Sequence, residues 1–90
     1  MEYPGGERIE LGDTVSVEMP NGWAEARIVM LGSTRKHLDM LPEHLAWYTG
    51  EGMEATEVVV EWLEDGKPRA GAYMSTHVNC CIKLIARAAS

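Results

Sequence analysis

Residues 58–75 read VVVEWLEDGKPRAGAYMS, and this stretch indicates how the chain folds. Val58, Val60 and Trp62 recur at every second position, which is the period of a half-buried strand. The apolar run stops at Asp65-Gly66, where glycine readily adopts the positive φ of a tight turn, and a second extended run follows. The stretch therefore predicts a β-hairpin with its apex at this dipeptide.

Two registers are compatible with such a hairpin. A three-residue turn places Glu61 opposite Arg69, and Val60 opposite Ala70 on the other face. A two-residue turn places Glu61 opposite Ala70, and Trp62 opposite Arg69. We favour the first register, because it pairs opposite charges on one face and apolar side chains on the other.

The segment upstream predicts a similar unit, since residues 13–32 read DTVSVEMPNGWAEARIVMLG. Val15 and Val17 alternate with polar neighbours, and Pro20-Asn21-Gly22 has the chemistry of a turn. The strand that follows becomes apolar on both faces from Val29 onward, which indicates that it enters a more covered region. We expect a first hairpin here.

Residues 33–56 break the strand pattern and form an insert between the two hairpins. Apolar residues recur there at helical spacing: Leu38, Leu41, Leu45 and Tyr48. Pro42 suits the first turn of a helix, where its missing N–H costs nothing. The spacing predicts a short helix over about residues 42–48, which must pack on the sheet to be stable.

The chain is expected to consist of a short leader and one domain that ends in a strand. Residues 1–10 contain Pro4, Gly5 and Gly6 and are expected to be a flexible leader. Residues 11–90 are expected to form one domain. The last strand is predicted to place Cys80, Ile82 and Leu84 on the core face, with Lys83 and the more accessible Cys81 on the other.

Three segments resemble SH3-like barrels of the Tudor type: GDTVSVEMPNGWAEARIVMLG looks like their opening hairpin, VVVEWLEDGK like the central hairpin, and HVNCCIKLI like the closing strand. The resemblance implies a mainly β fold, a five-stranded SH3-like bent barrel with a short helical insert between the second and third strands. The insert is longer than the usual loop at that place, so a non-barrel α+β sandwich stays open as an alternative.

Composition narrows the possible partners. The 90 residues carry a net charge of −6, and all 14 acidic residues lie between Glu2 and Asp65. This field repels phosphate and argues against a nucleic-acid partner. No apolar run reaches the roughly 18 residues needed to span a bilayer, and the N-terminus has no signal-peptide pattern. The two cysteines are adjacent, and a disulfide between them would strain the backbone. We therefore expect a cytoplasmic protein with reduced thiols and no membrane partner.

Aromatic residues supply the candidate binding site. Tudor-type barrels often hold a methylated amine in an aromatic cage at the barrel rim, through cation–π contacts. The resemblance implies such a site at Trp23 and Tyr73, with Glu25 adding negative charge. Ordinary packing of these rings is the competing interpretation.

No other chemistry is indicated by the side chains. His77 with Cys80 and Cys81 supplies only half of a structural zinc site, so no metal site is predicted. The carboxylates form no recognisable catalytic pair, and neither catalytic residues nor a cofactor are predicted.

The insert offers more apolar surface than a two-turn helix needs. A homodimer interface is one explanation, because exposed apolar patches mark interfaces. The residues expected in it are Leu38, Leu41, Leu45, Trp47 and Tyr48. A lid over the open end of the barrel is the other explanation.

These observations favour a non-enzymatic binding module for a peptide, a protein surface or a small cationic ligand. The alternative is a small acidic inhibitor or regulator protein from a mobile element or phage, which acts by protein–protein contact.

Overall fold

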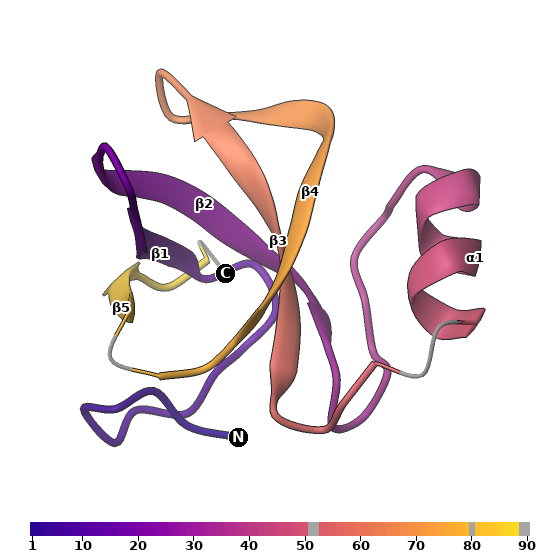
Figure 1. Cartoon of the computed structure of the whole chain (residues 1–90), viewed down its shortest axis with the longest axis horizontal. Coiled ribbons are helices and arrows are strands. Elements are labelled where there is room, and N and C mark those ends of the chain that lie inside the picture. Colours follow the sequence, from indigo (N-terminus) through magenta and orange to yellow (C-terminus); the bar gives the residue numbers. More distant parts are fainter. Residues whose placement is uncertain (51–52, 80, 89–90) are drawn as a thin grey trace.

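The computed structural model describes residues 1–50, 53–79 and 81–88. Within this part of the chain, five antiparallel strands form one bent sheet in the order β4-β3-β2-β1-β5 (Figure 1). The elements along the chain are β1 (Thr14–Met19), β2 (Gly22–Leu31), α1 (Pro42–Gly50), β3 (Glu57–Glu64), β4 (Lys67–His77) and β5 (Ile82–Ala86). The mainly β class, the five strands and the helix between the second and third strands are confirmed. The sheet does not close, because β4 and β5 stay at its two edges.

Both predicted hairpins are present. Met19 pairs with Gly22, so the first hairpin turns at Pro20-Asn21, and Glu64 pairs with Lys67 across Asp65-Gly66. Asp65 has a φ of 53° and Gly66 a φ of 79°. Two consecutive positive φ values are those of the type I′ turn that matches the twist of a two-residue hairpin.

The predicted register of the second hairpin is wrong. Leu63 pairs with Pro68, as a two-residue turn requires, but Glu61 then pairs with Tyr73 instead of Arg69 or Ala70. The ladder is interrupted between Pro68 and Tyr73, and this segment contains Gly71, which has a φ of 82°. Figure 1 shows a sharp bend in β4. A bulge of this kind leaves residues of one strand unpaired and shifts the pairing beyond it.

Replacing Gly66 with valine should lower the free energy of unfolding by about 1 kcal/mol or more. A Cβ atom at this position would meet no other atom within 4 Å, so the cost comes from the positive φ alone. Urea denaturation measures it. Gly66→Asn should cost less, because asparagine tolerates positive φ better than a β-branched residue. Equal stability of the valine variant would contradict the turn geometry.

The main core lies on the concave face of the sheet. Its buried members are Tyr3, Ile9, Val15, Val17, Ala26, Ile28, Val58, Val60 and Ile82. Tyr3 and Ile9 come from the segment that we expected to be a flexible leader. The leader instead folds back on itself, with Glu2 bridged to Arg8, and contributes two side chains that are 3% exposed. The buried aromatic ring of Tyr3 thus ties part of this segment to the sheet.

Asp13, directly before β1, connects this leader to Arg87, which follows β5. Its Oδ2 accepts hydrogen bonds from the Tyr3 hydroxyl at 2.7 Å, the Glu10 N–H at 2.9 Å and Arg87 Nη1 at 2.9 Å. Asp13 is 1% exposed. Burial and the hydrogen bond to Asp13 raise the pKa of Tyr3 far above its ordinary value of 10.0.

The raised pKa of Tyr3 predicts a loss of stability in alkali. The folded protein keeps the Tyr3 proton while the unfolded chain releases it, so the stabilisation is complete below pH 10 and declines as the pH rises above that value. One such group changes the free energy of unfolding by up to about 1.4 kcal/mol per pH unit. Urea denaturation between pH 8 and 11 should give a shallower decline for Tyr3→Phe than for the wild type. Parallel declines would show that Tyr3 ionises in the folded protein.

A second core lies under the insert, on the opposite face of β2 and β3. It contains Val29, Met30, Val59, Tyr48 and Met53. The Leu38 N–H donates to the Val29 carbonyl at 2.8 Å and ties the insert to β2. This cover explains why the strands are apolar on both faces here, as expected from Val29 onward.

The helix and the last strand largely match their predictions. Helix α1 begins at Pro42 and extends to Gly50, slightly beyond the predicted end. In β5, Ile82 is buried and Lys83 is exposed, which confirms the phase of the strand. The prediction for Cys80 lies outside the described residues. Among those described, no helix has the length and apolar character that crossing a bilayer requires.

Candidate functional site

The predicted rim residues Trp23 and Tyr73 do not come together. Tyr73 pairs with Glu61 on β3, and Glu61 pairs with Arg27 on β2. Trp23 lies four residues before Arg27, which is roughly 13 Å along the strand, and β2 is two strand spacings, roughly 10 Å, from β4. The two rings therefore occupy different parts of the same outward-facing surface.

Trp23 stands at the start of β2 and is 45% exposed. Lys83 Nζ lies 4.7 Å from the centroid of its ring, so a cation of the same chain already contacts the indole. Glu25 and Lys83 both pair with Ser16, which places the carboxylate in a neighbouring row of this exposed surface. The structure thus brings Trp23 and Glu25 into one region, beside Lys83.

Tyr73 is half-buried between β4 and the insert. Its hydroxyl accepts a hydrogen bond from the Leu41 N–H at 3.2 Å. Its ring meets the ring of His44 edge-on, with centroids 5.0 Å apart. These contacts hold the phenol in place and make it one wall of a cavity.

This cavity, which we call the β4 groove, has a volume of about 280 Å³. Its walls come from the insert, from β4 and from the outward face of β2 and β3. The lining residues are Arg27, Asp39, Met40, Leu41, Glu61, Pro68, Ala70 and Tyr73. Two carboxylates and one guanidinium therefore share a small space with apolar and aromatic walls.

An ion pair forms the floor of the β4 groove. Arg27 Nε donates to Glu61 Oε1 at 2.8 Å, and Arg27 Nη2 lies 2.7 Å from the same oxygen. The Glu61 side chain is 5% exposed, whereas that of Arg27 is 31% exposed. Among the described residues, no hydrogen bond reaches Glu61 Oε2, so one oxygen of a largely buried carboxylate stays available on the floor.

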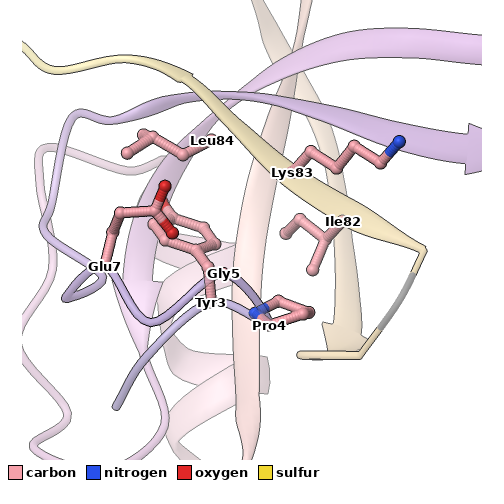
Figure 2. A pocket seen from close by; sticks show the side chains of 7 residues that line it. All are labelled: Tyr3, Pro4, Gly5, Glu7, Ile82, Lys83 and Leu84. Carbon is pink, nitrogen blue, oxygen red and sulfur yellow. The ribbon is translucent and has the colours of Figure 1, made fainter.

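A larger cavity of about 490 Å³ lies between the leader and β5. Figure 2 shows Ile82 pointing toward Pro4 and Leu84 above the ring of Tyr3, while the Lys83 amino group extends away. Its walls are largely apolar, and the Tyr3 hydroxyl is already bonded to Asp13. The β4 groove is the stronger candidate, because polar groups that converge in a cavity orient a ligand.

No protein-family model, curated protein or solved structure matches this chain. The function must therefore be inferred from the site.

The residues predicted for a dimer interface divide into two groups. Tyr48 is buried in the second core, and Leu38 and Leu45 pack against that core. Leu41 is 39% exposed and Trp47 is 56% exposed. The insert thus covers the sheet with part of its apolar surface and leaves two large side chains outside.

The dimer stays a prediction. Light scattering of the purified protein should give about twice the 10.0 kDa mass of the chain. Trp47→Ser should shift the mass toward that of one chain, because the exposed indole is the largest apolar group on the insert. If the measured mass were that of a single chain at high protein concentration, the dimer would be rejected. The insert would then be explained only as a lid over the open end of the barrel.

Sequence reasoning missed two groups of residues. The first group is Arg27 and Glu61, whose contact depends on the pairing of β2 with β3. The opposite charges of the two side chains are the signal that could have suggested this pairing. The second group is Glu54, Glu57 and His77, which meet at the open end of the β3–β4 hairpin, where β3 begins and β4 ends. The shifted register hid it, because the favoured register does not pair Glu57 with His77.

Proposed function

We propose that the chain is a non-enzymatic binding module whose β4 groove receives a positively charged group of a peptide, a protein surface or a small molecule. The observation that carries the proposal is the largely buried Glu61 carboxylate on the groove floor. Burying a charged group is costly unless partners compensate it. Arg27 donates to Oε1 and offsets the charge, and an ammonium group of a ligand would donate to Oε2.

The walls of the groove suit a lysine-like group. Asp39 adds a second carboxylate, and the Tyr73 ring offers a cation–π surface worth about 0.5–2 kcal/mol. Met40 and Leu41 provide apolar contacts for an aliphatic stem. Contacts of this size predict weak binding of an isolated amine, and tighter binding when neighbouring residues of a peptide also touch the surface.

The test uses two capped, otherwise uncharged peptides that carry either lysine or norleucine at the centre. Backbone amide shifts of the ¹⁵N-labelled protein report where each peptide binds. The lysine peptide should shift residues 39–41, 61 and 70–73, whereas norleucine, which lacks the charge, should bind at least fivefold more weakly. Equal affinity for the two peptides would reject a cation site.

Three variants distinguish binding in the groove from attraction by the overall negative charge of the protein. Glu61→Gln keeps the shape of the side chain and should weaken lysine binding at least fivefold. Asp39→Asn should weaken it too, without loss of stability, because Asp39 is exposed. Glu25→Gln removes one exposed carboxylate outside the groove and should leave binding unchanged.

The alternative function, a small acidic inhibitor or regulator, is favoured by the net charge of −6. It predicts equal losses in Glu61→Gln and Glu25→Gln and a steep salt dependence, since many exposed acids would act together. The assignment to SH3-like barrels of the Tudor type is likewise our proposal. Five antiparallel strands in one bent, barrel-like sheet support it.

A further inference from the structure

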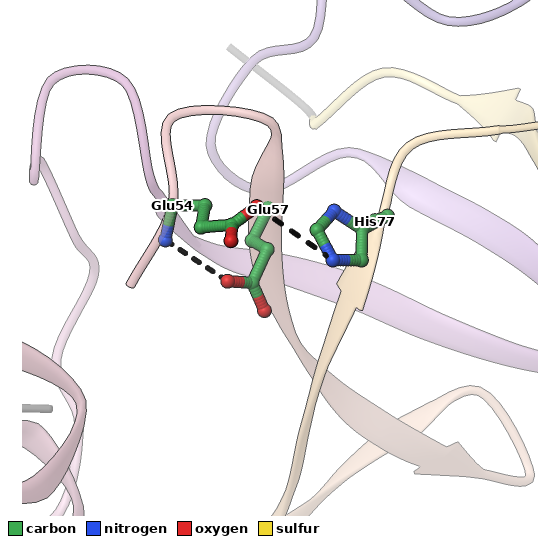
Figure 3. Close-up of side chains that lie close together, drawn as sticks. All are labelled: Glu54, Glu57 and His77. Atoms are coloured by element: carbon green, nitrogen blue, oxygen red, sulfur yellow. Dashed lines mark hydrogen bonds and ion pairs between the residues drawn. The ribbon is translucent and has the colours of Figure 1, made fainter. Parts of the chain in front are cut away.

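Three side chains with metal-binding chemistry meet where β3 begins and β4 ends: Glu54, Glu57 and His77 (Figure 3). One ligand atom from each lies within 4.8 Å of the other two. Glu57 and His77 are directly paired across β3 and β4, and Glu54 comes from the turn that leads into β3. None of the three lines the β4 groove.

The backbone that carries these side chains is well tied. The Glu57 N–H donates to the Glu54 carbonyl at 3.0 Å, and the Glu54 N–H donates to Glu57 Oε1 at 2.9 Å. The Gly32 N–H donates to the Glu57 carbonyl at 2.8 Å, which joins the turn to the end of β2. The three side chains therefore start from fixed positions.

The imidazole is oriented by a residue outside the trio. His77 Nδ1 lies 3.1 Å from Thr56 Oγ1, and the Val78 N–H donates to the Thr56 carbonyl at 3.1 Å. The other ring nitrogen, Nε2, faces Glu54, 4.0 Å from Oε2. A metal-binding histidine is typically held in this way, with one ring nitrogen bonded to a neighbouring group and the other directed at the metal.

The charges also favour a cation. Two carboxylates lie close together, and like charges at short range are unfavourable. In the described part of the chain, no lysine or arginine forms an ion pair with Glu54 or Glu57. The guanidinium of Arg35 instead donates to the Met53 carbonyl.

We propose that Glu54, Glu57 and His77 bind a divalent transition-metal ion, with Zn²⁺ as the best match. Imidazole nitrogen and carboxylate oxygen are both zinc ligands, and three protein ligands leave a fourth tetrahedral position open for water. Bonds of about 2.0–2.2 Å require the ligand atoms to move closer together than they are. The side chains of Glu54 and His77 are 69% and 55% exposed and have room to do so.

Calorimetric titration of ZnCl₂ into the metal-free full chain tests the site. The experiment uses a Cys80→Ser, Cys81→Ser background, because thiolates also bind Zn²⁺. One equivalent should bind, and His77→Ala should lower the affinity at least tenfold. Thr56→Val should also lower it, by about tenfold, which is the lower end of the effect of losing the hydrogen-bond partner of a metal-bound histidine. Circular dichroism checks that each variant folds.

His44→Ala is the matched control, because this histidine contacts Tyr73 and lies outside the trio. It should bind Zn²⁺ as the parent does. Long-range ¹H–¹⁵N spectra of the imidazoles should show a metal-induced shift of His77 Nε2. Unchanged affinity in His77→Ala would show that the ion binds only to surface carboxylates and would overturn the proposal. Absence of binding up to millimolar Zn²⁺ would overturn it as well.

Discussion

Asp13→Ala should lower the free energy of unfolding by about 3–5 kcal/mol. The substitution removes the acceptor that holds the Tyr3 hydroxyl, the Glu10 N–H and the Arg87 guanidinium at one buried oxygen. Tyr3 is 3% exposed, so its hydroxyl would stay buried without a partner. The stability of such a domain is about 5–15 kcal/mol, so the loss would be a large share of the total.

Glu10→Ala is the matched control for this prediction. Glu10 Oε2 lies 3.0 Å from the same Arg87 Nη1, but its side chain is 58% exposed. An exposed ion pair contributes about 0–1 kcal/mol, so this variant should unfold close to the wild type in urea. If Asp13→Ala were no less stable than Glu10→Ala, Asp13 would not be the anchor of the leader.

Gly32→Ala should also be strongly destabilising, with a loss of about 3 kcal/mol in the free energy of unfolding. A Cβ atom on Gly32 would collide with the backbone oxygens of Glu54 and Glu57. Backbone atoms cannot swing aside as a flexible side chain can, so the end of β2 and the turn must separate. That movement would break the hydrogen bond from the Gly32 N–H to the Glu57 carbonyl.

Gly50→Ala provides the comparison, since a Cβ at Gly50 meets no atom within 4 Å. Alanine is favoured over glycine in a helix, so this change should raise stability by up to about 1 kcal/mol. Thermal melts of both variants measure the difference. Similar melting temperatures for the two would mean that β2 and the turn at residues 54–57 do not pack as closely as described.

Local pattern accounts for the elements that could be predicted. Three kinds of signal depend on neighbours a few positions apart. They are the alternation in residues 13–32 and 57–64, the turn residues Pro20-Asn21 and Asp65-Gly66, and the helical spacing around Pro42. Such signals are visible in the chain before it folds, because side-chain direction follows backbone periodicity. The strands, both turns, the helix and the phase of β5 were therefore predictable.

The candidate sites depend on contacts that no local pattern contains. The bend of β4 near Gly71 displaces its pairing with β3, and this displacement sets Glu57 beside His77 and Tyr73 beside Glu61. Periodicity shows which face a side chain takes, but it does not show how far one strand has slipped past another when a bulge intervenes.

Burial was likewise decided by packing at a distance. The leader was judged by its glycines and proline, yet Tyr3 is held by Asp13 and by the core, which only the folded sheet assembles. Trp23 and Tyr73 look equivalent as aromatic residues near strand ends. One lies in the open against Lys83 and the other forms the wall of a groove, because the insert covers β4 and leaves the start of β2 exposed. Residue type and spacing are thus sufficient for the strands and turns, whereas the free energy of a site depends on which distant surfaces exclude water from it.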